Sequence, residues 1–458
     1  MSSPATAPLT SPLRLSKLPP GPRGLPVVGV APMLAADFWE YPRRVAAEYG
    51  DIAQLPMPTK RKFFLISHPD LVAKVFVRDA GNHWKGDMLR TIKEGLPASP
   101  MPTSDGEEWQ RVRRLAQPHF TLRGMKHLAG LIEETVQSHV DALDRYAATG
   151  QVVDMETLLS TMSMDVLMRA MFTRERSHDE LVRVGKDYQS FAIGGGLGWA
   201  LFWVPERIRH LVTVKADAAR ERLLAFIREM IAERQADPID SPDVLNALMN
   251  SRFDDGSTLT DDELTAELFG LIFAGFETTS AALAWTLAFL SANPAARAAA
   301  EAEAEALGRV PKFDDAAKLT YLRACFDEAQ RIQGIPFYSR DSYEDQELGG
   351  YTIPGGSTLL CSPYALQHDS RFWREPDKFL PERFLEDEIE KNAWLPFGTG
   401  PRRCMGMHLA NTEAGLFLGY ALQKYRFVTV EGFEPKRFFH MSTSLKGGCP
   451  VRIERRTT

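Results

Sequence analysis

The stretch Phe397-Gly-Thr-Gly-Pro-Arg-Arg-Cys404-Met-Gly406 places one cysteine in a turn rich in glycine and arginine. It directly precedes an apolar segment, His408 to Tyr425, that has the pattern of a helix. Backbone N–H groups freed by the turn, a helix N-terminus and neighbouring guanidinium groups all stabilise a cysteine thiolate at neutral pH. A thiolate held in this way is a metal ligand or a nucleophile, and the glycines let the backbone approach a flat ligand closely.

The stretch meets every fixed position of F-x-x-G-x-R-x-C-x-G, and so resembles the haem-binding loop of the cytochrome P-450 family. The resemblance implies haem b (iron protoporphyrin IX) with Cys404 as its axial thiolate ligand. It also implies that Phe397 packs beside the thiolate, that Arg402 binds a haem propionate and that Gly406 lines the cofactor. A thiolate on haem iron favours O–O cleavage. The alternatives are a buried cysteine in an ordinary loop and a nucleophilic cysteine, although Cys404 has no local cysteine-protease signature.

Composition is that of an ordinary globular protein. The 458 residues are 44% hydrophobic and 25% charged, with a net charge of -6, which gives no case for nucleic-acid binding. The four cysteines lie far apart, without a C-x-x-C pair, which disfavours a structural zinc site and suits a reducing cytosol.

No segment has the pattern of a signal peptide or a membrane anchor. Residues 1–17 are rich in Ser, Pro, Thr and Ala, and we expect a disordered tail. Two uncharged stretches are as long as a membrane span, but three glycines interrupt Tyr188 to Pro205, and Thr278 to Ala296 contains several hydroxyl residues and an Asn-Pro stop. We therefore expect a soluble, cytoplasmic protein without a transmembrane anchor.

Hydrophobic periodicity predicts a mostly helical chain with a small β-rich region. Predicted helices cover 69–77, 106–119, 125–147, 155–172, 206–235, 260–292, 294–307 and 321–332; predicted β regions cover 51–56, 62–67 and 340–360. Length alone favours about three domains. The resemblance, which extends from Pro19 to Arg456, implies instead one catalytic domain over 18–458, with haem between a long central helix and the cysteine loop.

A second motif, Ala274-Gly-Phe-Glu277-Thr278-Thr279, breaks the rules of the helix predicted over 260–292. Glycine costs about 1 kcal/mol in a helix interior, threonine competes for backbone bonds, and a buried carboxylate needs a partner or water. Such violations point to function, here a proton relay beside an oxygen site. The motif resembles the family's A-G-x-[DE]-T-[TS], which implies that Glu277 and Thr278 are an acid–alcohol pair and that Ala274 faces the haem. Alone, the motif also fits a kinked core helix.

Three charged residues match scaffold motifs of the family. Glu328 and Arg331 lie three apart on one helical face, which by itself is uninformative because such exposed pairs contribute only tenths of a kcal/mol. The family joins this E-x-x-R pair to the arginine of a P-E-R-F segment. The resemblance therefore implies a buried triad of Glu328, Arg331 and Arg383 that supports the haem loop.

Three further residues, a tryptophan and two arginines, match positions at which the family binds the haem propionates. Trp109 and Arg113 are spaced i, i+4 on one helical face, and an indole N–H beside a guanidinium suits a half-buried carboxylate. The resemblance assigns both to a propionate, and Arg340 to the position of another propionate ligand; a packed amphipathic helix is the alternative for the first pair. Lys85, His83 and His119 are additional candidates.

The substrate region departs from the family, because only one proline follows Arg331 in the segment that passes near the substrate. Ile335, Pro336 and Phe337 of this segment are candidate pocket residues. Trp199 is another, in a glycine- and aromatic-rich run over 191–204 that we expect to form a flexible apolar cover. A lipophilic substrate of terpenoid, steroid or fatty-acid type follows; shallow membrane contact by the cover is the alternative.

Together the motifs predict a haem monooxygenase that inserts one atom of dioxygen into an organic substrate by hydroxylation or epoxidation. Arg111, Arg114 and Arg403 can form a basic patch for an acidic external redox partner, a ferredoxin or flavodoxin served by an NAD(P)H reductase. The alternatives are a haem-thiolate peroxygenase, isomerase or dehydratase, whose members typically lack the acid–alcohol pair, and a non-catalytic haem sensor.

Overall fold

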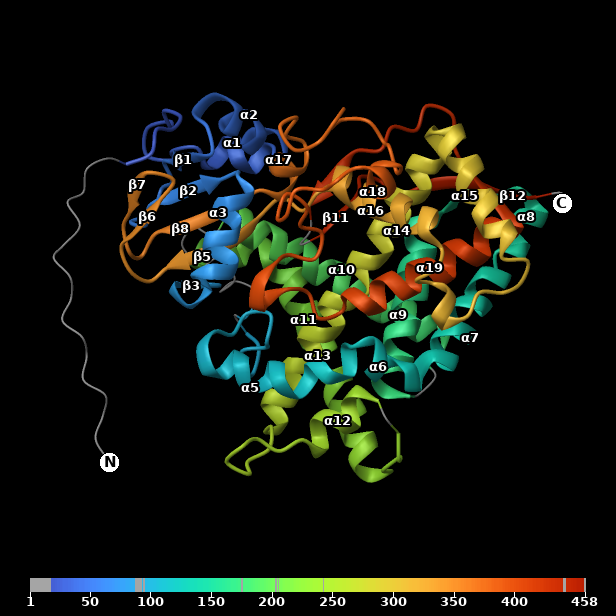
Figure 1. The fold of residues 1–458 in the computed structure, drawn as a ribbon. Coiled ribbons are helices and arrows are strands. Elements are labelled where there is room, and N and C mark those ends of the chain that lie inside the picture. Colours follow the sequence, from blue (N-terminus) through green and yellow to red (C-terminus); the bar gives the residue numbers. More distant parts are fainter. Residues whose placement is uncertain are drawn as a thin grey trace.

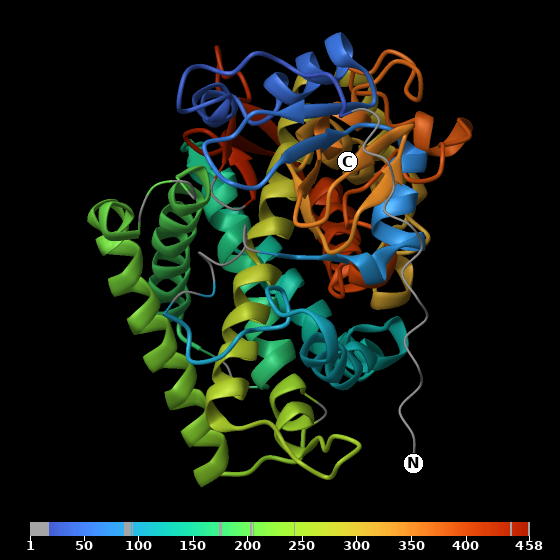
Figure 2. The same ribbon diagram turned by 90° about the vertical axis from the view of Figure 1, so that its left-hand side faces the viewer.

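The computed structural model is a helical body with the main sheet at one side and β12 near the opposite end (Figure 1). The model describes residues 18–86, 93, 95–173, 176–201, 204, 206–241, 243–439 and 442–456. The predicted N-terminal tail, 1–17, lies outside the described residues. The two views, a quarter turn apart, show the long α11 running along one flank of the molecule and away from the strands (Figure 2).

The long helices surround three central helices that are mostly buried, α9 (Met155–Phe172), α13 (Asp261–Gly275) and α14 (Glu277–Ala292). A helix that is apolar all round belongs inside a large protein rather than on its surface. Around them lie α5 (Gly106–Ala116), α7 (Ala129–Asp141), α8 (Asp144–Thr149), α10 (His178–Ala200), α11 (Glu206–Ala236), α12 (Val244–Asn250), α15 (Pro294–Ala306), α16 (Thr320–Gln333) and α19 (Met407–Lys424). Shorter helices are α1 (Ala31–Ala36), α2 (Glu40–Tyr49), α3 (Pro69–Ala73), α6 (Leu122–Met125), α17 (Pro363–Gln367) and α18 (Arg383–Glu386).

The main sheet has the strand order β1-β2-β8-β5-β3. Its strands are β1 (Ile52–Leu55), β2 (Phe63–Ile66), β3 (His83–Trp84), β5 (Tyr338–Ser342) and β8 (Thr358–Cys361), and only the β2–β8 pair is parallel. Smaller sheets pair β6 (Gln346–Leu348) with β7 (Tyr351–Ile353), β10 (Arg437–Phe439) with β11 (Thr443–Leu445), and β4 (Val153–Asp154) and β9 (Tyr425–Thr429) with β12 (Pro450–Arg455).

The main sheet is buried on both faces. In β2, Phe63 and Leu65 join an apolar cluster with α1 and α2, whereas Phe64 and Ile66 join a second cluster on the opposite face. Successive side chains of a strand point to opposite faces, so a continuous apolar run is what a doubly covered strand requires. A third and larger cluster fills the helical body.

Most predicted elements are confirmed, and three expectations about helices are wrong. The helix predicted over 155–172 has these bounds, whereas 125–147 is divided among α6, a short 3-10 turn, α7 and α8. The helix predicted over 260–292 is interrupted at Phe276. The β regions at 51–56, 62–67 and 340–360 contain β1, β2 and β5 to β8.

The third error concerns the glycine run, which does not interrupt a helix. The α10 helix continues through Gly194 to Ala200, and so the segment 191–204, which we expected to form a flexible apolar cover, begins as helix; positions 202 and 203 lie outside the described residues. A Cβ atom on Gly194 would clash with the Cβ atom of Ala216 in α11. This glycine therefore serves close helix packing.

One helical stretch, Asp261–Ala292, is long and apolar enough to cross a membrane among the described residues. In the structure, 72% of its most apolar window is buried inside the protein. Since the stretch is the central pair α13 and α14, burial in the core accounts for its composition.

The packing of α10 can be tested with two glycines of the same helix. Gly194→Ala should destabilise the protein by about 1–3 kcal/mol through overpacking against Ala216. Gly185, which has open space around it, should gain stability of up to about 1 kcal/mol when replaced by alanine, because alanine favours the helix. Thermal melting of both variants measures the difference; equal melting shifts of the same sign would contradict the packing.

Candidate functional site

The cysteine loop is a closed turn ahead of α19. The Cys404 N–H donates to the Phe397 carbonyl at 2.8 Å, and Gly400 has a φ of +70, a conformation that favours glycine. Of the four cysteines only Cys404 is exposed, yet burial raises the pKa of its thiol, while the Gly406 and Met407 N–H groups and Arg113 lower it. Because the residue is exposed although protein surrounds its thiol, we infer that Cys404 faces a hollow inside the protein rather than bulk water.

The helix across from this loop is interrupted within the second motif. The α13 helix ends at Gly275 and α14 begins at Glu277, with Phe276 between them. Ala274 and Thr278 are exposed, although most of both helices is buried. The α14 and α19 helices contact each other, and so the two motifs lie on neighbouring elements.

The acid and the alcohol of this motif have different partners. The Thr278 hydroxyl donates to the Ala274 carbonyl at 3.1 Å, a bond that competes with the helix ladder. The Glu277 carboxylate accepts from the hydroxyl of Ser442, which precedes β11. The predicted acid is therefore held by the β10–β11 hairpin, a partner about 165 residues away that no local pattern indicates.

A group of cations surrounds one carboxylate near the cysteine loop. Arg402 contacts Asp105 at 2.5 Å, and burial lowers the pKa of Arg402 to about 10. Burial and the Arg402 charge lower the pKa of Arg340 to about 10. Burial and both arginines lower the pKa of Lys85 to about 7. Among the residues that the structure describes here, these three cations have the one carboxylate of Asp105 between them, and the two propionates of haem would fit this excess of positive charge.

The predicted propionate pair from α5 lies beside this group. The guanidinium carbon of Arg402 lies 4.0 Å from the centroid of the Trp109 ring, and Trp109 is half-buried. Arg113 donates to the Arg403 carbonyl at 2.9 Å and to Gln117 at 3.0 Å. The structure therefore brings Trp109, Arg113, Arg340 and Arg402 together, and it adds Lys85 from the set of open candidates.

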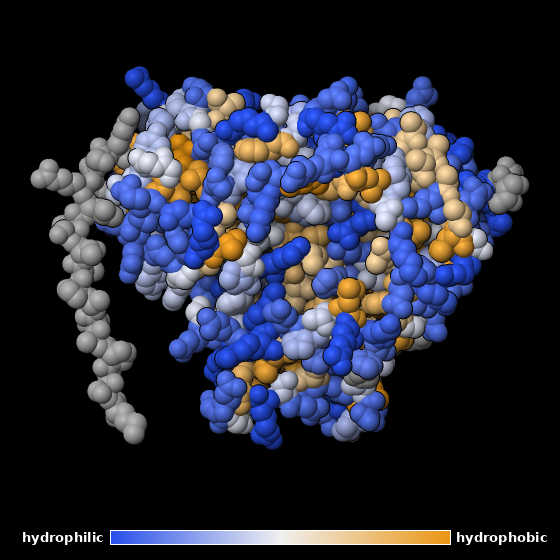
Figure 3. All heavy atoms as spheres, viewed as in Figure 1, coloured by the Kyte–Doolittle hydropathy of each residue, from blue (hydrophilic) through white to orange (hydrophobic). Residues whose placement is uncertain are grey.

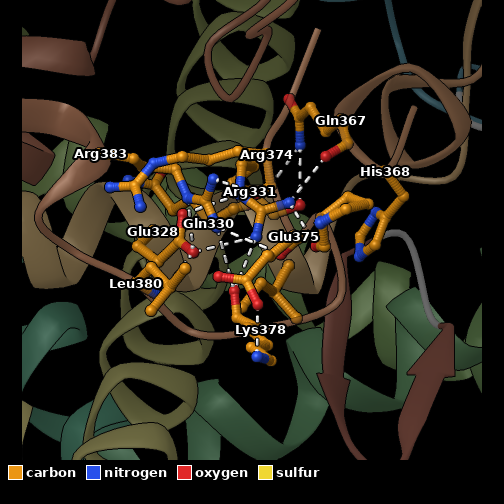
Figure 4. Close-up of polar contacts among 12 residues, drawn as sticks. Glu328, Gln330, Arg331, Gln367, His368, Arg374, Glu375, Lys378, Leu380 and Arg383 are labelled. Carbon is orange, nitrogen blue, oxygen red and sulfur yellow. Dashed lines mark hydrogen bonds and ion pairs between the residues drawn. The ribbon is translucent and has the colours of Figure 1, made fainter. Parts of the chain in front are cut away.

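The three scaffold residues form one buried network (Figure 4). Glu328 accepts from Arg331 at 2.7 and 2.9 Å and from Arg383 at 3.0 Å, and these side chains are at most 1% exposed. The remaining guanidinium N–H groups donate to backbone carbonyls, those of Gln367, Arg374, Glu375, Pro376 and Lys378. A buried charge network needs such complete satisfaction.

One residue that the sequence did not indicate connects this network to the cysteine loop. Gln367 donates to the Arg331 carbonyl at 3.0 Å and accepts from the Leu395 N–H at 2.9 Å, two residues before Phe397. The Tyr338 hydroxyl donates to the Leu395 carbonyl at 2.9 Å. A lone buried glutamine has no motif, so only the tertiary structure reveals this connection.

Three of the four candidate substrate residues lie in one segment whose side chains the structure describes. Ile335 is half-buried and Pro336 is buried, while Phe337 packs edge-on against Phe38 with ring centroids 6.4 Å apart. Trp199 lies in α10, but its side chain is outside the described residues. The preceding Gly334 carbonyl accepts from the side chains of Trp39 and Thr443, which fixes the path of the segment.

Of the three arginines predicted to form a basic patch, two contact a neighbouring loop. Arg111 lies over the Phe253 ring at 3.8 Å and donates to Ser257, and Arg114 pairs with Asp254 at 3.6 Å. Both side chains therefore engage the loop that follows α12, and Arg403 remains as the exposed arginine beside Cys404.

Comparisons with known proteins agree with this geometry. A family model described as Cytochrome P450 matches residues 19–450. Cyclooctatin synthase of Streptomyces melanosporofaciens is 30% identical over 421 residues, covering 90% of each chain, and Cyclooctat-9-en-7-ol 5-monooxygenase of the same organism is 28% identical over 427 residues with the same coverage. Human Cytochrome P450 3A5 is 27% identical over 434 residues, covering 89% of this chain and 85% of its own.

Among solved structures, the crystal structure of the cytochrome P450DA heme domain superposes with a TM-score of 0.84 at 25% identity. The match covers 97% of this chain and 98% of that one, so the whole architecture is shared.

The buried network predicts a large asymmetry between two arginines. Arg383→Ala removes one guanidinium from Glu328 and should destabilise the protein by about 3–5 kcal/mol, because a charge is left buried without its partner. Arg374→Ala removes an ion pair with Asp387 that is about half-exposed, and should cost less than about 1 kcal/mol. Denaturant unfolding measures both, and a small loss for Arg383→Ala would show that the network does not carry the loop.

Proposed function

Because this chain belongs to the cytochrome P450 family and is a haem-dependent monooxygenase, we propose that it oxidises a lipophilic substrate of terpenoid, steroid or fatty-acid type. Haem with an axial cysteine thiolate supplies the activation of dioxygen when it is bound. The observation that carries the assignment to this site is the accessible Cys404 thiol in a dry hollow, with cations short of negative charge around it.

We propose that Cys404 is the iron ligand and that Lys85, Arg340, Arg402 and Arg113 hold the propionates, with the Trp109 indole beside them. Burial, and after it repulsion from neighbouring arginines, lowers the pKa of Lys85 and of Arg340, and two carboxylates beside these cations would offset both effects. Phe397, whose carbonyl accepts from the Cys404 N–H, and Gly406, whose N–H faces the thiol, shape the thiolate side.

Proton supply is assigned to Glu277 and Thr278. Thr278 is exposed, and its hydroxyl donates its one proton to the Ala274 carbonyl in the structure. Once it rotates away from that carbonyl it can donate this proton to another acceptor while it accepts one from a neighbouring acid. The neighbouring acid is Glu277, which lies one residue before Thr278 on the helix and accepts a hydrogen bond from Ser442. Ala274 is exposed on the turn before them, and its small side chain leaves room beside the hydroxyl.

The lipophilic substrate is supported by the candidate pocket residues and by the relatives. Ile335, Pro336, Phe337 and Trp199 are proposed as pocket residues, and they offer apolar and aromatic surface. The name Cyclooctat-9-en-7-ol 5-monooxygenase gives that relative an unsaturated alcohol as substrate. A mostly hydrocarbon molecule of this kind suits an apolar pocket.

Electrons come from an external redox partner, as in the family, and we propose a ferredoxin or flavodoxin with an NAD(P)H reductase. The exposed Arg403 next to Cys404 supports an acidic partner. We also propose that 18–458 forms one catalytic domain and that the protein is soluble and cytoplasmic. The face shown in Figure 3 is mainly hydrophilic, with hydrophobic areas in separate patches, which suits a surface in water.

The substrate class is tested by titrating a library of molecules and following the spin-state change of the haem band. Lipophilic molecules should shift the band at lower concentrations than small polar ones, because they displace water from an apolar pocket. A library in which only small polar molecules shift the band would refute the lipophilic assignment.

The proton assignment is tested with two adjacent threonines. Thr278→Ala should lower the product formed per reductant consumed, by a factor on the order of 10 or more, since a positioned proton donor contributes about 10²–10⁴-fold. Thr279→Ala is the matched control, because Thr279 is buried and should leave this coupling unchanged. Equal coupling in wild type and Thr278→Ala would contradict the assignment.

A further inference from the structure

A turn between two prolines, Pro100-Met101-Pro102, lies beside the cation group. Proline has no backbone N–H, so Met101 supplies the only backbone donor of these three residues. The N–H groups of Thr103 and Ser104 donate to the Pro100 carbonyl at 2.8 and 3.0 Å, which closes the turn. Met101 is buried, so its single N–H requires a partner within the protein.

The α13 helix supplies that partner and the space for both prolines. Both carboxylate oxygens of Glu267 accept from the Met101 N–H, at 2.8 and 3.0 Å. Gly270 lies three residues later on the same helical face. A Cβ atom on Gly270 would lie 2.9 Å from the Pro100 Cβ and 3.2 Å from the Pro102 Cδ, so any side chain there would push the turn away.

The opposite side of the turn contacts the cysteine loop. Arg402, two residues before Cys404, donates to the Ser104 carbonyl at 2.7 Å and to the Met101 carbonyl at 3.4 Å. It also pairs with Asp105 at 2.5 Å. The N–H of Met101 is thus bound by α13 and its carbonyl by the cysteine loop, and the turn bridges the two elements that flank the hollow.

Glu267 is an unusual residue for this place. It is 3% exposed and its neighbours on α13 are buried, so an apolar residue would be the ordinary choice. In the part of the chain that the structure describes, its hydrogen bonds go to Met101 alone, and it has no ion pair. Binding the single N–H of the turn is what this acid does in the structure.

We propose that Glu267 and Gly270 form a socket on α13 for the Pro100–Pro102 turn, and that Glu267 is the positioning residue that holds the turn against Arg402 and so closes the propionate edge of the haem site. The inference rests on the proposed haem site. It assigns Glu267 no contact with substrate or with the reacting atoms. Its effect is on how firmly the edge of the site stays closed.

The socket makes closure of this edge depend on pH. Burial raises the pKa of Glu267 to about 8, the Met101 N–H lowers it, and the negative charges of Glu108 on α5 and Glu263 on α13 raise it. When the turn opens, water reaches Glu267 and its pKa returns toward the ordinary value of 4.5. The closed form therefore holds a proton that the open form releases, so rising pH between about 4.5 and 8 favours opening.

The test measures transfer of haem from the holoenzyme to an excess of a haem-free globin. Wild-type transfer should accelerate on the order of tenfold or more from about pH 6 to about pH 8, since linkage changes the open population by up to about tenfold per pH unit. Glu267→Gln keeps the size and one acceptor but cannot ionise, and its transfer rate should lose this acceleration. A variant that keeps the wild-type acceleration would overturn the proposal.

Glu413→Gln is the matched control. Glu413 is also buried, burial raises its pKa to about 7, and it bonds to Ser163 rather than to the turn. This variant should keep the wild-type acceleration. If it removed the acceleration as Glu267→Gln does, the pH dependence would be a general effect of buried acids, which would contradict the socket. Gly270→Ala is a second, independent variant, which should speed transfer at both pH values by several-fold, and unchanged transfer would count against the socket.

Hydrogen exchange separates this inference from the haem assignment. Exchange of the Met101 amide in the full chain reports the socket with or without haem, and its protection should fall in Glu267→Gln and Gly270→Ala but not in Glu413→Gln. Protection that is equal in all four proteins would overturn the socket. A chain that takes up no haem yet shows this pattern would overturn the haem site and leave the socket standing.

Discussion

The buried carboxylate of Glu328 holds two guanidinium groups, and the position of the cysteine loop depends on it. Arg331 and Arg383 share this carboxylate and use their other N–H groups on the backbone between Gln367 and Lys378. That backbone supplies Gln367, whose side chain binds the segment before Phe397. Because ionised groups out of water are costly unless fully paired, the network tolerates only one arrangement of these segments. The loop is thus fixed by charges that lie outside the hollow.

The charges around Cys404, unlike those around Glu328, are not fully paired. Among the described residues near Cys404, cations outnumber carboxylates, and burial makes that excess of positive charge unfavourable. The two propionates of haem would relieve this repulsion, and the charge of Arg113 favours the thiolate form of Cys404. The interruption between α13 and α14 leaves Thr278 exposed, and this is the residue to which we assign proton supply. In this proposal the cations and the proton-supplying residues come from different elements of the fold.

From the sequence, the residues of the chemical motifs could be predicted better than the residues that hold those motifs in place. The motifs around Cys404 and Thr278 are local, because a loop and a single helical turn supply their residues, and the family, the fold class and the cofactor are confirmed. The roles of the individual site residues stay predictions. Gln367, Ser442 and Glu267 were not predicted, since each acts through a contact with a segment more than 25 residues away. The course of α10 was predicted wrongly because the packing of Gly194 against Ala216 outweighs the helix propensity of glycine.

The central claim, that Cys404 ligates haem as a thiolate, is tested most directly by the absorption spectrum of the reduced carbon monoxide complex. The wild-type protein should show the strongly red-shifted Soret band of a thiolate-bound haem, and Cys404→Ser should lose it while keeping the fold by circular dichroism. A wild-type complex without the red shift, or a Cys404→Ser protein that retains it, would contradict the account.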